Sequence, residues 1–284
     1  MNMTQSSVRA KRVTERATES PAEASQGQDQ GSSNPSSPDV SQCRAEGPVQ
    51  PSKNYSASLG SDETRRIVLF GKTGSGKSSL TNTIFREDVF KINYALYSET
   101  RECRAETRSV IGRSITLIDT PGFFDLDKSK EELRDEVVKC IIECAPGPHV
   151  FLILLKVEKF TNHEKQVIDE IRKTFSEEAF KYAAVVFTHG DQLPERKKIE
   201  EFVQQNKVLS DLVKKCGGRC HVFDNKYWKN NQQDKYRSNQ FQVAELLKTI
   251  DKIVEENKGG YYTNEMTQTV YSMINKHERR CNVF

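Results

Sequence analysis

The chain of 284 residues carries 43 basic and 40 acidic side chains, and its net charge of +3 gives no argument for a nucleic-acid partner. Its longest apolar run, Val150 to Leu155, is far shorter than the ~20 residues that a membrane-spanning helix needs. The first ten residues are polar and lack a secretory signal, and the 7 cysteines form no disulfide framework. We therefore expect a cytoplasmic protein with no nucleic-acid partner.

The first 60 residues differ in composition from the rest of the chain. They contain a single aromatic residue, Tyr55, and Ser/Pro-rich runs such as residues 31–38. Because such a segment buries too little apolar surface to offset the entropy of ordering, we predict a disordered tail over residues 1–60. Two interpretations of this tail stay open: a plain linker, and a phosphorylated or partner-binding segment. The remainder, residues 64–284, is the right size for one core, and we assign residues 64–257 to the domain itself.

A glycine-rich motif opens this domain. Residues 65–70 are typical of a strand, and residues 71–78 match G-x-x-x-x-G-K-[ST] ahead of a helical pattern. Glycine lets the backbone take positive φ and approach phosphate oxygens, so that successive N–H groups bind an anion at the helix N-terminus. Lys77 adds a cation for the β- and γ-phosphates, and the Ser78 hydroxyl is placed to ligate Mg²⁺. The predicted phosphate-binding residues are Gly71, Gly74, Ser75, Gly76, Lys77, Ser78 and Ser79.

A second motif, Asp119-Thr-Pro-Gly122, follows an apolar strand at residues 114–119. That strand carries Asp119 to the carboxyl edge of the sheet, where open α/β folds bind ligands. The arrangement D-x-x-G is typical of GTPases. We predict that Asp119 holds Mg²⁺ through water and that the N–H of Gly122 senses the γ-phosphate.

The connection between the two motifs, residues 87–108, is long and polar, as suits a mobile switch segment. Thr100 is our candidate for the hydroxyl that closes on Mg²⁺ and the γ-phosphate, with Thr107 and Ser98 as alternatives. Many signalling GTPases carry a glutamine directly after D-x-x-G to orient the attacking water, and here that position is Phe123. We therefore predict slow intrinsic hydrolysis unless another residue or a second subunit supplies the missing group.

Two further strand ends carry residues suited to reading a base. Residues 182–188 form an apolar strand that ends in Thr188-His189-Gly-Asp191, in the place of the N-K-x-D motif. The Asp191 carboxylate suits the two donors of guanine, which adenine lacks. His189 suits stacking on the base, and a capping or surface histidine is the alternative. Asp224 and Asn225 follow a strand at residues 219–223, where a side chain or the backbone would contact guanine O6; a plain turn is the alternative. The predicted base-binding residues are Thr188, His189, Asp191, Asp224 and Asn225.

Across residues 65–257 these motifs resemble those of the GIMAP family, the GTPases of immunity-associated proteins. The markers are residues 71–78, 100–103 and 119–125, the segment 133–171 with its Ala-Pro-Gly-Pro run, and residues 216–219 ahead of Asp224-Asn225. His189 is similar to a histidine of the related septin-like and chloroplast-import GTPases. Two positions depart from the family: Asp224, where Asn is frequent, and Thr188-His189, where many members carry a basic pair. The resemblance implies a GTP-loaded form that self-associates through its nucleotide face, often on intracellular membranes, with immune or cell-survival roles.

The order of the expected elements predicts the fold class. Strands are expected near 65–70, 108–112, 114–119, 149–155, 182–188 and 219–223, and helices near 77–86, 130–144, 162–175, 195–215 and 240–256. This alternation predicts a three-layer α/β fold, a P-loop GTPase domain with a mostly parallel twisted sheet. The short connection between strands 108–112 and 114–119 predicts that this one pair is antiparallel.

Residues 261–284 are expected to form a helix and a short tail. Met266, Val270, Met273, Ile274 and His277 lie near one helical face, which suits either packing against the domain or a membrane or partner. Residues 281–284 fit the C-a-a-X prenylation pattern apart from their polar second residue, and coincidence is the alternative. On this basis we expect contact with the cytosolic face of an intracellular membrane.

The motifs together predict a switch that binds GTP or GDP with Mg²⁺ and hydrolyses GTP slowly. Lys77, Ser78, Thr100, Asp119 and Gly122 are the residues expected at the reacting phosphate, and Ser78, Thr100 and Asp119 those expected at the metal. A GTP-loaded scaffold with negligible turnover is one alternative. An ATP-using P-loop kinase is another, which the sequence of residues 188–191 argues against.

Overall fold

The computed structural model describes residues 64–90, 103–122, 130–229 and 234–281. Within these ranges one sheet contains β1 (Arg65–Phe70), β2 (Arg104–Val110), β3 (Arg113–Asp119), β4 (Val150–Lys156), β5 (Ala183–Thr188) and β6 (Cys220–Val222). The strand order is β2-β3-β1-β4-β5-β6, and β2 with β3 is the antiparallel pair in an otherwise parallel sheet. The predicted fold class is confirmed.

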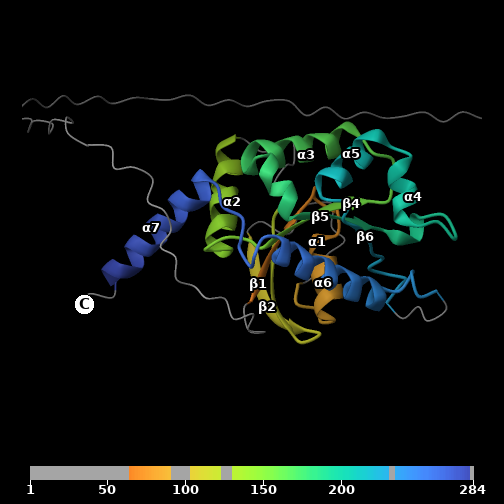
Figure 1. Ribbon diagram of the computed structural model, residues 1–284, viewed down its shortest axis with the longest axis horizontal. Helices are drawn as coiled ribbons and strands as arrows, with labels where there is room; N and C mark the ends of the chain where they lie inside the picture. The colour runs from red at the N-terminus through yellow and green to blue at the C-terminus, as the bar shows by residue number, and fades with distance from the viewer. Residues whose placement is uncertain (1–63, 91–102, 123–129, 230–233, 282–284) are drawn as a thin grey trace, which may run out of the picture. The chain divides into compact units, whose positions relative to one another are not determined.

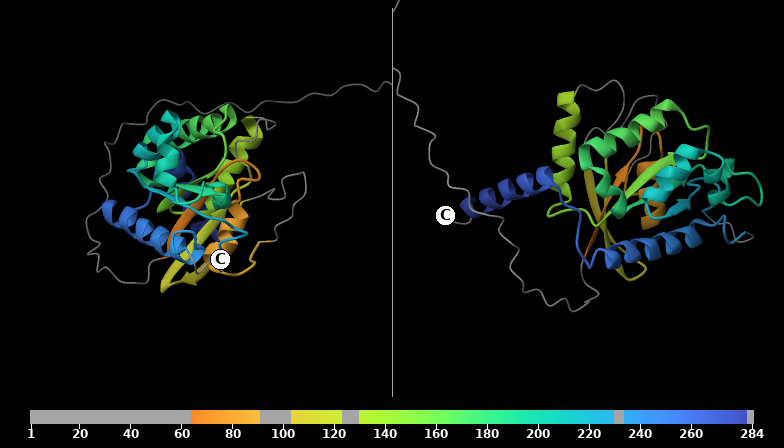
Figure 2. Two further views of the ribbon diagram at one scale, coloured as in Figure 1. Left: turned by 90° about the vertical axis from the view of Figure 1, so that its right-hand side faces the viewer. Right: turned by 45° about the horizontal axis from the view of Figure 1, so that its top comes forward.

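Helices cover both faces of this sheet (Figures 1 and 2). One face carries α1 (Lys77–Phe85) and α6 (Asn239–Glu256). The other carries α2 (Lys130–Glu143), α3 (Asn162–Phe175), α4 (Ile199–Gln204) and α5 (Lys207–Lys215). Because successive side chains of a strand point to opposite faces, β1 sends Ile67 and Leu69 to the first layer and Val68 and Phe70 to the second. Two short 3-10 turns complete the domain, η1 (Glu177–Tyr182) and η2 (Gly190–Gln192).

The parallel strands bring the sequence motifs to one edge of the sheet. The register pairs Leu69 with Asp119 and Phe70 with Ile153, so β1 and β3 end together. The pair β4 and β5 continues three residues further, to Lys156 opposite Thr188. This carboxyl edge is where open α/β sheets bind their ligands. The fold therefore places the loop after β1 beside Asp119 on one side and beside the end of β5 on the other.

The predicted start of the second strand, at residue 108, was wrong. β2 begins at Arg104, because its polar side chains lie on an antiparallel edge strand that pairs with β3 along its whole length. Thr107 and Thr116 face each other in this register, with their Oγ1 atoms 2.7 Å apart. Thr107 is thus part of the sheet, and it is excluded as the hydroxyl of a mobile switch.

The single helix predicted over residues 195–215 was also wrong. The structure has two helices, α4 and α5, with a break at Gln205 and Asn206. The Oδ1 atom of Asn206 accepts hydrogen bonds from the N–H groups of Val208 (2.9 Å) and Leu209 (3.1 Å), which caps a new helix. Asparagine here therefore starts α5 instead of continuing α4.

The last helix, α7 (Glu265–Cys281), follows a buried tyrosine. Tyr262 is 2% exposed, and its hydroxyl donates a hydrogen bond to the carbonyl of Phe175. Met266 and Val270 pack against the apolar cluster of the α2 and α3 face, which confirms packing against the domain for the start of the predicted amphipathic face. Met273, further along, is 63% exposed. No helix within the described residues has both the length and the apolar character needed to cross a membrane.

Candidate functional site

The loop between β1 and α1 has a shape that requires glycine. A Cβ on Gly71 would lie 2.5 Å from the Oγ of Ser75 and 2.8 Å from the carbonyl oxygen of Leu154. Gly74 and Gly76 have φ angles of +74° and +89°, in the left-handed region that favours glycine. The loop closes with a hydrogen bond from the N–H of Ser75 to the Lys72 carbonyl at 3.1 Å. This is the tight, open-backboned turn that an anion-binding loop needs.

Lys77 places its positive charge inside this loop. The side chain is 6% exposed, and Nζ donates hydrogen bonds to the carbonyls of Gly71 (2.9 Å) and Lys72 (3.2 Å). The same residue begins α1, so the ammonium adds to the positive end of the helix dipole. Ser78 and Ser79 follow in the first turn. The predicted residues 71–79 therefore form a loop and a first helical turn with the positive charge of Lys77 at their centre.

Ser78 and Asp119 meet directly. The Ser78 hydroxyl donates a hydrogen bond to Oδ2 of Asp119 at 2.5 Å, and Asp119 is 1% exposed. Burial raises the pKa of the Asp119 carboxyl, while the Lys77 cation and the Ser78 hydrogen bond oppose this rise. Oδ1 is buried and has no hydrogen-bond partner among the described residues. A buried carboxylate oxygen without a hydrogen-bond partner is unfavourable, and a bound cation would supply the missing interaction.

These two side chains fit a magnesium ion. Mg²⁺ is bound by oxygen ligands, typically one or two protein groups that act together with phosphate and water. The Ser78 hydroxyl and the Asp119 carboxylate are two such oxygen groups, and they lie in direct contact. Thr100, the third predicted ligand, lies outside the described residues.

The start of the Asp119-Thr-Pro-Gly122 motif is fixed to β1. The hydroxyl of Thr120 donates to the Leu69 carbonyl at 2.6 Å, and Thr120 is fully buried. Gly122 is buried at the end of this described segment, three residues after Asp119. Phe123 lies outside the described residues.

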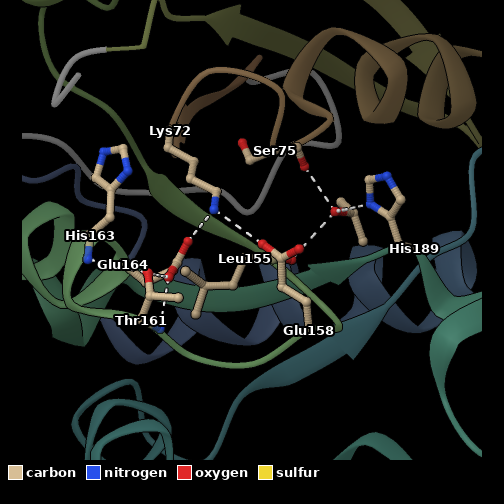
Figure 3. A network of polar contacts seen from close by, with 9 residues as sticks. Lys72, Ser75, Leu155, Glu158, Thr161, His163, Glu164 and His189 are labelled. Carbon is tan, nitrogen blue, oxygen red and sulfur yellow. Dashed lines mark hydrogen bonds and ion pairs between the residues drawn. The ribbon is translucent and has the colours of Figure 1, made fainter. Parts of the chain in front are cut away.

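The end of β5 contacts the phosphate loop from the other side. The Thr188 hydroxyl donates to the Ser75 carbonyl at 2.8 Å, and Nδ1 of His189 lies 3.1 Å from the same hydroxyl (Figure 3). His189 adopts a φ of +58° and is exposed, as is Asp191. Burial, together with a hydrogen bond shared with Asp224, raises the pKa of Asp191. Of the predicted base-reading residues, His189 and Asp191 thus have exposed side chains, whereas Thr188 is buried against the phosphate loop.

Trp228 supports this base-reading loop, a role that sequence reasoning missed. A Cβ on Gly190 would lie 2.6 Å from Cη2 of Trp228, so the indole lies against the backbone of the loop. Trp228 is 4% exposed, and the Arg237 guanidinium lies 5.7 Å from the centroid of its ring. Only glycine allows the indole to approach so closely. The requirement for glycine between His189 and Asp191 was the available sequence signal.

Asp224 braces the two base-reading loops against each other. Its carboxylate accepts hydrogen bonds from the N–H groups of Lys226 (2.9 Å), Tyr227 and Asp191 (3.3 Å). Although burial raises the pKa of Asp224, the hydrogen bonds from Asp191 and from backbone N–H groups lower it overall. Asn225 turns toward α1, where its Oδ1 lies 2.9 Å from the Thr83 hydroxyl. Direct contact of Asp224 or Asn225 with a base stays a prediction.

A second lysine of the phosphate loop, Lys72, points outward. Figure 3 shows its ammonium between Glu158, at 3.1 Å, and Glu164. Glu164 also accepts a hydrogen bond from the N–H of Thr161 at 2.9 Å, which caps α3. Burial acts to raise the pKa of Glu164, but its contacts with Lys72 and Thr161 lower that pKa to about 2. Burial acts to lower the pKa of Lys72, but its contacts with Glu164 and Glu158 raise it. We call the contact of Lys72 with Glu164 and Glu158 the Lys72 clamp. Sequence analysis did not predict it.

Solved structures share this architecture. Toc33 from Arabidopsis thaliana in complex with GDP and Mg²⁺ matches with a TM-score of 0.53 and 20% sequence identity, over 68% of this chain and 85% of that one. A dimerization-deficient mutant of Toc33 matches with a TM-score of 0.55 at the same identity and the same coverage. At such identities the similarity shows the fold.

Sequence comparison is more specific. Immune-associated nucleotide-binding protein 8 of Arabidopsis thaliana is 36% identical over 221 residues, which cover 75% of this chain and 59% of that protein. GTPase IMAP family member 8 of Homo sapiens is 30% identical over 203 residues, 72% of this chain and 30% of that protein. The chain thus spans less than two thirds of these relatives' length. The AIG1 family profile matches residues 65–281, which confirms the resemblance drawn from the motifs. The chain belongs to the AIG1 family.

Proposed function

We propose that the chain binds GTP and GDP together with Mg²⁺ at the carboxyl edge of the sheet. The observation that carries this proposal is the contact between Ser78 and Asp119 at the base of the phosphate loop, with Oδ1 of Asp119 buried and lacking a partner among the described residues. Support also comes from the relatives, which are named nucleotide-binding proteins and GTPases, and from the Toc33 structures with GDP and Mg²⁺ or with Mg²⁺ and GMPPNP.

Each residue of the site has a role in this proposal. The N–H groups of residues 71–79 and the Lys77 ammonium bind the phosphates, while Ser78 and Asp119, with Thr100 as the third predicted ligand, hold the metal. Bound Mg²⁺ would neutralise charge on the β- and γ-phosphates. Asp191 accepts hydrogen bonds from guanine, and His189 stacks on the base. The N–H of Gly122 responds to the γ-phosphate.

We propose that hydrolysis of GTP is slow in the monomer and that the GTP form self-associates through its nucleotide face. The support for slow turnover is Phe123, whose side chain offers no hydrogen bond to the attacking water. The support for self-association comes from the similar chloroplast translocon components, atToc33 and psToc159, for whose GTPase activity dimerization is important. A GTP-loaded scaffold that barely turns over is the alternative that Phe123 also favours.

The deciding experiment is release of nucleotide from the purified chain, followed by turnover measured over a wide range of protein concentrations. We expect guanine nucleotide in the released fraction and a specific activity that rises with protein concentration. Fast turnover with a specific activity that does not change with protein concentration would place the water-orienting group within the monomer. It would contradict activation by self-association. Retained GTP with negligible turnover at every concentration would favour the scaffold. Equal affinity for ATP and GTP would overturn guanine recognition.

We also propose that the protein works in the cytosol at the surface of an intracellular membrane, through residues 261–284. The support is the exposed apolar side chains of α7, with Tyr271 36% and Met273 63% exposed. Fractionation of cells that express the chain tests this proposal. The Met273→Glu variant is expected to shift from the membrane to the soluble fraction, and an unchanged distribution would count against α7 as the contact.

A further inference from the structure

The strand β4 directs its last residue, Lys156, toward the phosphate loop. Alternate residues of a strand share one face, and Leu152 and Leu154 belong to the apolar cluster under α1 and α6. Lys156 is next in this alternation and extends past the end of that cluster. Its partner in the register is Thr188, whose side chain bonds to the loop at Ser75. Two neighbouring strands therefore point their last side chains at the same loop.

The ammonium of Lys156 reaches the loop at Gly74. Nζ lies 4.0 Å from the position that a Cβ on Gly74 would take. Gly74 is exposed, whereas Gly71 and Ser75 are buried, so Lys156 approaches the loop from its open side. The left-handed φ of +74° at Gly74 belongs to the backbone geometry that turns N–H groups toward an anion.

Lys156 differs from Lys72 in its charge balance. Lys72 lies between Glu158 and Glu164, which neutralise its charge. For Lys156, in contrast, no carboxylate of the described ranges comes within ion-pair distance. An ammonium held beside an anion-binding loop without a carboxylate to neutralise it is suited to an anion that arrives from solution.

His189 gives this lysine a specific place in the site. The N-K-x-D pattern carries a lysine where this chain has His189, so the base-reading loop presents an imidazole in place of an ammonium. Lys156 comes from the neighbouring strand, paired in register with the residue just before His189. An ammonium is thus present on β4, beside the strand end that leads to the base-reading loop.

We propose that Lys156 is a nucleotide-binding residue whose ammonium contacts the phosphate chain of the bound guanine nucleotide. This inference rests on the proposed function, because it assigns a further contact to the same site. Neither the phosphate-loop motif nor the base-reading motif contains position 156. The role follows from the strand register and from the distance to Gly74.

The test compares Lys156→Gln, Lys156→Arg and the control Lys248→Gln, which removes the same charge from a lysine on α6 that is 69% exposed. Affinities of the full chain are measured for GTP, GDP and guanosine, the last by competition. Loss of a charged hydrogen bond is expected to weaken GTP and GDP binding by about ten- to a hundredfold in Lys156→Gln. Guanosine, which has no phosphate, should bind all variants alike, and Lys156→Arg should recover most of the lost affinity.

The outcomes separate this inference from the proposed function. Wild-type affinity for GDP in Lys156→Gln, or an equal loss for GDP and guanosine, would overturn the phosphate contact and leave guanine binding intact. A parent chain that binds no guanine nucleotide would overturn the proposed function itself. Thermal unfolding of each variant without nucleotide shows whether the fold survives, and if Lys156→Gln is unfolded, Lys156→Met provides the neutral comparison.

Discussion

The hydroxyl of Thr188 donates a hydrogen bond to the main-chain carbonyl of Ser75 at 2.8 Å, and both residues are fully buried. The two lie 113 positions apart in the chain. Thr188 ends the strand that leads to the base-reading loop, and Ser75 lies in the phosphate loop. A single side chain therefore fixes the spacing between the two halves of the site, and a nucleotide that bridges the halves depends on that spacing.

Replacement of Thr188 by valine removes this hydrogen bond and leaves the Ser75 carbonyl buried without it. We expect the free energy of unfolding to fall by about 1–3 kcal/mol, with weaker GDP binding, because an unsatisfied buried acceptor is costly. Thr188→Ser keeps the hydroxyl and should recover most of both losses. Thr107→Val, on the edge strand, serves as the control in denaturant unfolding and GDP titration. If Thr188→Val and Thr188→Ser behave alike, the hydroxyl has no such role.

Base recognition is tested at Asp191. The Asp191→Asn variant loses the acceptor for the two guanine donors, which should cost about 1–3 kcal/mol of GTP affinity or more. Xanthosine triphosphate carries an oxygen where guanine has its amine, so its affinity should fall far less. Competition binding with both nucleotides measures the ratio of affinities. Equal losses for the two would indicate that Asp191 acts only through the fold of its loop.

Metal dependence is tested at Asp119. In Asp119→Asn the buried carboxylate beside Ser78 becomes a neutral amide, a poorer ligand for Mg²⁺. The parent chain should bind GTP more tightly with Mg²⁺ than with EDTA, and the variant should lose most of that difference. Affinity in EDTA should change little or even rise, because a negative charge near the phosphates is removed. A preserved Mg²⁺ effect would place the metal elsewhere.

Local sequence patterns were sufficient to place the motifs on the fold. The apolar runs before Gly71, Asp119 and Thr188 became β1, β3 and β5, since buried parallel strands are continuously apolar. The polar strand β2 was placed too late, because an exposed edge strand lacks that signal. The break between α4 and α5 was missed because Asn206 was treated as an ordinary helical residue, when its side chain caps α5.

The site was predictable where it follows one continuous motif, and less so where distant segments meet. Residues 71–78 join β1 to α1 and Asp119 ends β3, as expected from the sequence, and their contacts with nucleotide and metal stay predictions. The clamp of Lys72 with Glu164 and the support of Gly190 by Trp228 join segments that no local pattern connects. Asp224 is another case in which distant segments meet. Its motif suggested contact with a base, and its carboxylate accepts hydrogen bonds from the backbone N–H groups of Asp191 and Lys226.

Trp228 offers a direct readout of the base-reading loop. It is the one tryptophan of the chain, and its ring lies against Gly190. A base that binds between His189 and Asp191 should change the surroundings of the indole. We expect GDP to change the intrinsic fluorescence and ATP to leave it unchanged at equal concentration. Gly190→Ala brings a Cβ to within 2.6 Å of the ring, so it should weaken GDP binding and lower the melting temperature.

The clamp of Lys72 with Glu164 predicts a pH dependence of stability. The Glu164 side chain is 5% exposed, and its pKa of about 2 lies below the ordinary value of 4.5. The unfolded chain therefore binds more protons than the folded chain between these two values. The stabilisation is fully present above pH 4.5 and is lost as the pH falls toward 2. For a shift of this size it amounts to about 3 kcal/mol.

Glu164→Gln removes the titrating group, and Glu178→Gln is the control, because Glu178 is 67% exposed in its pair with Lys181. Urea unfolding of the parent and both variants from pH 6 to pH 2.5 measures the difference. The gap between the parent and Glu164→Gln should be widest near neutral pH and should close as the pH falls, while the control follows the parent throughout. If the free energies of unfolding of the parent and Glu164→Gln change with pH in parallel, the Glu164 carboxylate does not cause the pH dependence. In that case Lys72→Gln would show whether Glu158 carries it instead.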